Sequence, residues 1–188
     1  MLRRAAVGCA VVALVSSGAA AQGRYTRDDV RFMQTMMAHH AQALTMVALV
    51  ADRTERPEFK AFAEGLKNSQ SDEMAAMRRW LALRHEDIPV PDAAHPLDAG
   101  IMTGIRAPGT LSEAEMMDLE DAKGAEFERL FLTDMIKHHE GALSMVRELA
   151  HTPGAGQESE MSRFVSGVES DQRAEIARMR GLLEKLGK

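Results

Sequence analysis

The sequence predicts an all-helical protein, a four-helix bundle made of two repeated helical hairpins joined by a long crossover. The first observation is an internal repeat. Residues 32–49 align with residues 131–148 at a constant offset of 99, and each segment contains a His-His pair flanked by Met. The second observation is that apolar residues recur every three or four positions in both segments, the period of a helix with one buried face. No segment has the alternating pattern of apolar and polar residues that would predict a β-strand.

The first copy predicts two helices separated by a short turn. Thr26, with Asp29 three residues later, indicates a capped helix start, and the periodic segment continues to about Ala51. The segment from Thr54 to Pro57 begins a second helix, because proline is favoured in the first turn. We expect that helix to continue to about Arg84.

The second copy repeats this hairpin with a longer turn. The pattern Gln70-x-x-Glu73 reappears as Gln172-x-x-Glu175 at an offset of 102, so the second turn, residues 151–157, holds three more residues. The last helix should reach Leu186. Residues 85–111 are rich in proline and glycine and predict an irregular crossover, followed by a short capped helix that opens at Ser112 and is interrupted by Gly124.

The N-terminus has the order of a secretory signal peptide. Arg3 and Arg4 precede a short apolar stretch, and small residues end it at Ala21. Cleavage there leaves one helical-bundle domain, residues 22–188, with repeat one at about 26–84, the linker at about 85–111 and repeat two at about 112–187. We therefore expect a periplasmic or secreted protein that does not insert into a membrane once the signal peptide is removed.

The amino-acid composition excludes several classes of site and partner. The only cysteine, Cys9, lies in the signal peptide, so the mature chain has neither disulfides nor thiolate ligands. Removing Arg3 and Arg4 changes the formal charge from -5 to -7, an acidic balance that argues against nucleic acid as a partner. Aromatic residues make up only 4% of the chain, whereas it contains 14 Met, more than gap-filling in a core requires.

Helical spacing gathers sulfur and imidazole on one face of each repeat. Met36, His39 and Met46 fall within about one quadrant of the helix, and the small Ala43 lies between them. Met135, His138 and Met145 repeat the pattern, with Ala142 in the small position. The second helix of each copy adds Met77 or Met179 as a candidate third ligand. His40 and His139 point about 100° away and could serve a second site, meet a neighbouring helix or reach solvent.

Polar residues accompany the candidate ligands on the second helix of each copy. They share one helix face by their spacing and are Gln70, Glu73, Gln172 and Glu175. They could hydrogen-bond the free ring nitrogen of a ligating His, which fixes its tautomer and orientation. Solvent contacts or hydrogen bonds between helices are equally compatible with the pattern.

The donor set selects a soft metal ion. Thioether and imidazole without thiolate favour Cu(I), with Ag(I) as a chemical mimic and Cu(II) compatible with His-rich positions. Calcium and magnesium need clustered oxygen ligands, which the scattered acidic residues do not supply. A di-iron bundle needs paired Glu-x-x-His segments, and only Glu148-x-x-His151 occurs. The residues therefore predict a copper ion as the bound species.

Other interpretations remain open at this point. Met at helical spacing is often simply core, which is our interpretation of Met74, Met116, Met117 and Met161. His95 and His151 are interpreted as surface residues, while His85 and Met102 could contribute to copper binding from the linker. The rival functions are a b-type haem or electron-transfer bundle, a metal oxidase, and a helical scaffold that binds a partner without metal.

The two segments Phe32 to Met46 and Phe131 to Met145 share the pattern Phe-x-x-x-Met-x-x-His-His-x-x-Ala-x-x-Met, which resembles the signature of the domain of unknown function 305 family. The resemblance implies a ferritin-like helical bundle, usually exported, with a cyanobacterial periplasmic copper-binding protein among its relatives. The ligand positions that the resemblance implies are Met36, His39, His40, Met46, Met135, His138, His139 and Met145.

The sequence thus predicts a periplasmic protein that binds Cu(I) for sequestration, resistance or transfer to a copper-accepting partner, and that is not an enzyme. Two departures between the copies suggest that the sites differ. Trp80 has only Leu182 as its counterpart, and Ala41-Gln42 stands where the second copy has Glu140-Gly141.

Overall fold

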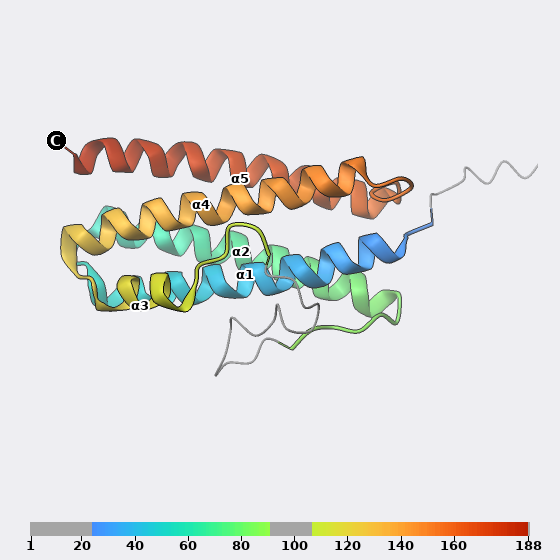
Figure 1. The fold of residues 1–188 in the computed structure, drawn as a ribbon, viewed down its shortest axis with the longest axis horizontal. Helices are drawn as coiled ribbons and strands as arrows, with labels where there is room; N and C mark the ends of the chain where they lie inside the picture. Colours follow the sequence, from blue (N-terminus) through green and yellow to red (C-terminus); the bar gives the residue numbers. More distant parts are fainter. Residues whose placement is uncertain (1–23, 91–106, 188) are drawn as a thin grey trace, which may run out of the picture.

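The computed structural model describes residues 24–90 and 107–187, and within these ranges it is helical without any strand. Four long helices form two antiparallel hairpins that pack side by side (Figure 1). A short helix, α3, lies against α1 and α4. The helices are α1 (Arg27–Arg53), α2 (Pro57–Leu83), α3 (Glu113–Asp121), α4 (Gly124–His151) and α5 (Ser159–Leu186). The predicted bundle of two repeated hairpins is confirmed.

The helix ends follow the local signals in the sequence. Thr26 caps α1 through a reciprocal capping box with Asp29, and Ser112 caps α3 in the same way with Glu115. Pro57 begins α2. Gly124 has a φ of 57°, a left-handed conformation that glycine adopts readily, and it marks the change of direction between α3 and α4.

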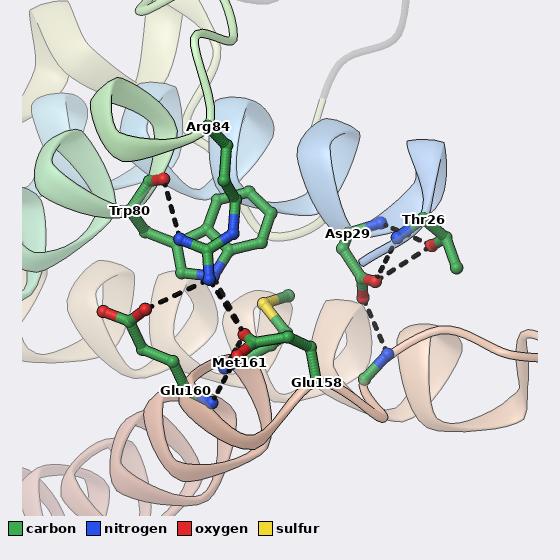
Figure 2. Close-up of polar contacts among 8 residues, drawn as sticks. Thr26, Asp29, Trp80, Arg84, Glu158, Glu160 and Met161 are labelled. Carbon is green, nitrogen blue, oxygen red and sulfur yellow. Dashed lines mark hydrogen bonds and ion pairs between the residues drawn. The ribbon is translucent and has the colours of Figure 1, made fainter. Parts of the chain in front are cut away.

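The longer turn of the second repeat is tied to the start of α1. Asp29 accepts hydrogen bonds from the Thr26 backbone at 2.7 Å and from the Gly156 backbone N–H at 2.7 Å (Figure 2). Ala155, next to it, is buried. The residues of this longer turn therefore make tertiary contacts, and they join the α4–α5 hairpin to the α1–α2 hairpin.

A cation–π contact fastens the same end of the bundle. The Arg84 guanidinium carbon lies 4.1 Å from the centre of the Trp80 ring, and Arg84 also pairs with Glu158 at 3.2 Å and Glu160 at 3.1 Å (Figure 2). Trp80 Nε1 donates to Glu158 at 3.3 Å. These contacts link the end of α2 to the start of α5, and the Leu182 counterpart of Trp80 has no ring for an equivalent contact.

Candidate metal centre

Two histidine rings from different repeats stack at the centre of the bundle. His39 on α1 and His138 on α4 occupy equivalent positions, and their ring centroids lie 3.7 Å apart with 36° between the planes. Burial, followed by the neighbouring His40, lowers the pKa of His39 to about 3. Burial and the His39 ring lower the pKa of His138 well below its ordinary value. Both rings are therefore neutral at pH 7, which is the form that binds metal ions.

The end of the crossover forms a strap over this pair. We define the strap as residues 107–111. His39 Nε2 lies 3.0 Å from the carbonyl oxygen of Pro108, and a carbonyl can only accept, so Nε2 carries the proton. The lone pair of neutral His39 is then on Nδ1, which has no hydrogen-bond partner within the described residues. The strap thus selects the tautomer of His39.

Gln42 and Gly141 hold the strap in place. The Gln42 side chain makes two hydrogen bonds to the Leu111 backbone, accepting at 2.8 Å and donating at 3.0 Å. On the other side, a Cβ at Gly141 would lie 1.9 Å from the Pro108 oxygen, so only glycine permits this approach. The difference between Gln42 and its counterpart Gly141 therefore has a structural reason, because both contact the same strap, whereas Glu140, the counterpart of Ala41, pairs with Arg180 on α5.

His40 and His139 meet the neighbouring helices. His40 Nε2 makes a hydrogen bond to Glu73 on α2, and His139 Nε2 lies 2.7 Å from Glu175 on α5. Both rings are buried and contact a neighbouring helix, so the alternative that they reach solvent is wrong, and a metal site at these residues stays a prediction. Glu73 and Glu175 thus orient His40 and His139 rather than the stacked pair.

The two glutamines are buried, and three of their four polar side-chain atoms have no hydrogen-bond partner within the described residues. Gln70 and Gln172 are each 1% exposed, which contradicts a role in solvent contact. Neither polar atom of the Gln70 side chain, nor Nε2 of Gln172, has a hydrogen-bond partner within the described residues. The Gln70 amide therefore orients no histidine ring in this structure, because the Glu residue one turn further along occupies that position.

The six methionine candidates divide into two buried clusters. One apolar core group contains Met36 and Met77 of the first repeat with Met145 of the second, beside Met33, Met37 and Met161, and we name its three candidate ligands cluster A. Cluster B is its counterpart under exchange of the repeats and is formed by Met46, Met135 and Met179. Although Met36 and Met46 share a helix face, about 15 Å of helix rise separates them, which is why they belong to different clusters. Each cluster therefore contains methionines from both hairpins.

Unpaired nitrogen atoms lie along the helices between the two clusters. His39 Nδ1, His40 Nδ1, His138 Nε2 and His139 Nδ1 are buried and have no hydrogen-bond partner in the part of the chain that the structure describes. An unsatisfied buried polar atom destabilises a fold by about 1–3 kcal/mol. Within residues 24–90 and 107–187, no group of three or more His, Cys, Asp or Glu is placed to hold a metal ion. A metal ion here would therefore need thioether ligands beside imidazole.

The remaining sequence predictions have mixed outcomes. Met116 and Met161 are buried as expected and Met74 is half-buried, but Met117 is 62% exposed, so the prediction that it belongs to the core was wrong. Met116 lies on the face of α3 that packs against the bundle. Met117 is the next residue, so its side chain points about 100° away from that face. His151 is exposed and bonds the Arg147 carbonyl, and His85 is exposed in a turn. His95 and Met102 lie outside the described residues.

Comparison with known proteins identifies relatives of the whole bundle. The family described as "Domain of unknown function (DUF305)" matches residues 29–183. No protein of curated function matches the sequence. A DUF305 protein from Streptomyces coelicolor is 28% identical with a TM-score of 0.71, and the match covers 85% of this chain and 94% of that one. A DUF305 fragment from Deinococcus radiodurans is 30% identical with a TM-score of 0.69, covering 86% and 98%.

A third similar structure contains copper. CopM in its Cu(I)-bound form is 23% identical with a TM-score of 0.63, and the match covers 86% of this chain and 98% of that one. CopM is also known in Cu(II)-bound and Ag-bound forms. At this identity the likeness shows a shared fold.

Proposed function

This chain belongs to the DUF305 family, and we propose that it is an exported copper-binding protein that holds Cu(I) through Met and His side chains for sequestration or transfer. The observation that carries the proposal is the arrangement of the centre. The methionine candidates of clusters A and B are buried along the same helices as a stacked, neutral His39–His138 pair, and each of these two rings has a buried nitrogen without a hydrogen-bond partner within the described residues.

The chemistry of these donors favours Cu(I). Thioether sulfur is a soft, uncharged ligand that does not titrate, and imidazole suits copper in both oxidation states. Neutral donors in a buried site also match a monovalent cation, since each added charge raises the desolvation penalty of burial. Ag(I) should bind in the same place, and Cu(II) should prefer the nitrogen-rich centre around the four histidines.

The relatives support this proposal. CopM binds Cu(I), Cu(II) and Ag with the same helical architecture. On this chain, the candidate ligands are the six methionines of clusters A and B together with His39, His40, His138 and His139. Glu73 and Glu175 act as positioning residues that orient His40 and His139 through hydrogen bonds.

The centre is better suited to carrying a metal ion than to catalysis. The candidate groups are ligands contributed by α1, α2, α4 and α5, and reversible binding needs no further reacting group. A metal oxidase would instead consume oxygen steadily with Cu(I) or Fe(II), and a haem protein would show a Soret band when purified. A copper-accepting protein is the partner that transfer requires.

Export rests on the N-terminal residues 1–21, which lie outside the described residues. The Streptomyces coelicolor relative is described as a predicted secreted protein. None of the helices in the described ranges has the length and apolar character needed to cross a membrane. We propose the periplasm as the location, with residues 22–188 as a single mature domain.

Anaerobic Cu(I) titration of the mature protein against a chromophoric chelator tests the proposal. We expect the wild type to compete with the chelator and the double variant His39→Ala, His138→Ala to compete at least about 10-fold less well, since losing a ligand should cost no less than losing the partner that orients one. Met117→Leu is the matched control, because Met117 is exposed and should change nothing. If the wild type leaves all copper on the chelator, the clusters are core only, and a helical scaffold becomes the better interpretation.

A further inference from the structure

One face of the bundle carries a groove between the first half of α1 and the last half of α4. Its volume is about 120 Å³. Exposed Arg31 and Glu148 lie at its edge. The lining includes Asp28, Arg31 and Thr35 from α1, with Met145, Glu148 and Thr152 from the α4 side.

The groove has an internal counterpart that is filled. At the repeat offset of 99, its lining positions correspond to Phe127, Leu130, Asp134, Met46, Leu49 and Arg53. There, α3 contacts both α1 and α4. Leu119 of α3 belongs to the same apolar cluster as Met46 and Phe127, and Arg53 Nε donates to the Glu120 carbonyl at 2.8 Å. The same surface of the repeat is thus covered at one end of the bundle and open at the other.

This difference distinguishes the two methionine clusters. Met145 of cluster A is 6% exposed and lines the open groove, whereas Met46, its counterpart in cluster B, is fully buried. The residues around Met145 and around Met46 differ in the same way. Asp28, which pairs with Arg31 at 3.7 Å, and Glu148 bring carboxylates to the open groove. Phe127 and Leu49 occupy the equivalent positions beneath α3, where Asp134 is the one carboxylate among the counterparts named above.

We propose that the α1–α4 groove is the route by which a soft monovalent cation enters and leaves cluster A, so that cluster A exchanges its ion rapidly and cluster B slowly. Because Asp28 pairs with Arg31 at 3.7 Å, the Glu148 carboxylate attracts the cation to the groove, and the Met145 sulfur receives it at the base. The cation then passes to the buried Met36 and Met77 sulfurs. The α3 helix denies cluster B an equivalent route. This inference rests on the proposed function, because it assigns different exchange rates to the two halves of that centre.

Release kinetics test the inference. The full mature protein, loaded anaerobically with Cu(I), is mixed with excess chromophoric chelator, and the appearance of the chelator complex is followed over time. We expect a fast and a slow phase. Met145→Leu should remove the fast phase, and the matched variant Met46→Leu should remove the slow phase.

Two further variants separate access from ligation. Thr35→Trp places a bulky ring in the groove without removing a ligand, so the fast phase should slow severalfold while the number of bound ions stays the same. Leu119→Ala loosens the packing of α3, so the slow phase should become faster. The second variant keeps the test decisive if the first does not fold.

The outcomes distinguish this inference from the function on which it rests. Tight Cu(I) binding with a single release phase that neither Thr35→Trp nor Leu119→Ala alters would overturn the access route and leave the copper-binding function intact. Failure of the wild type to bind Cu(I) at all would overturn both.

Discussion

His39 Nε2 lies 3.0 Å from the carbonyl oxygen of Pro108, so a residue of the crossover holds a ring at the centre of the bundle. The crossover therefore does more than connect the two hairpins. It covers the stacked histidines, determines which nitrogen of His39 is free, and depends on the close approach of Gly141.

Gly141→Ala should detach the strap. The added Cβ would lie 1.9 Å from the Pro108 oxygen, and both groups belong to backbone that can only move as a unit. We expect a loss of about 1–3 kcal/mol in the free energy of unfolding, the range for an overpacked site, measured by urea denaturation.

Gly65→Ala is the matched control for this variant. Gly65 is also helical, and a Cβ added there would have no neighbour within 4 Å. The substitution should stabilise the protein by about 0.5–1 kcal/mol. Equal effects of the two substitutions would show that the strap does not press on α4.

Acid should destabilise the metal-free protein. His39, with its pKa lowered to about 3, stays neutral in the folded state while the unfolded chain takes up a proton near pH 6.5. Because the unfolded state then binds more protons, stability falls as pH falls between about 6.5 and 3. His138 adds to the effect in the same direction.

Urea denaturation at several pH values measures this loss. The double variant His39→Leu, His138→Leu should lose less stability on acidification than the wild type, since the two titrating rings are gone. A variant with the same pH dependence as the wild type would assign the acid sensitivity to other groups.

Glu175→Leu should affect both stability and copper. His139 would lose its 2.7 Å partner, and leaving a buried ring nitrogen unsatisfied should reduce stability by about 1–3 kcal/mol. Copper affinity should fall by about 10–100-fold because the ring is no longer oriented. Glu169→Leu, the same exchange at a half-buried position of α5 that pairs with Arg173, is the control, and chelator competition is the measurement.

Trp80→Leu copies the residue that the second repeat has at this position. The Arg84 contact with the ring and the hydrogen bond to Glu158 would both be lost. We expect a loss in the free energy of unfolding that stays below the value of about 3–5 kcal/mol typical of Trp→Ala, because leucine keeps part of the buried apolar volume. Copper stoichiometry should remain unchanged, because Trp80 supplies no ligand, although it belongs to the same apolar core group as cluster A. A change in stoichiometry would show that the end contacts influence the centre.

Much of this architecture could be predicted from local signals. The capping residues Thr26 and Ser112, the proline at position 57 and the repeated Met and His spacing each act within one or two helical turns, so the helix positions and faces follow from them. Periodicity also shows which residues share a face, as it did for Met36, His39 and Met46.

The partners of those faces depend on tertiary geometry. Helical spacing cannot show that Met145 joins Met36 from the other repeat, or that the strap residue Pro108 reaches His39 from 69 positions away. The roles of Gln42 and Gly141 could be suspected only from the difference between the two copies, because nothing near them in the sequence indicates a crossing strap. The exposure of Met117 likewise depends on which face of α3 packs against the bundle.

X-ray absorption at the copper edge of the Cu(I)-loaded mature protein tests the central claim most directly. We predict both sulfur and nitrogen scatterers around copper, with the sulfur contribution reduced in Met36→Leu, Met135→Leu and the nitrogen contribution reduced in His39→Ala, His138→Ala. A spectrum without sulfur, unchanged by the methionine substitutions, would contradict a copper centre built from the two methionine clusters.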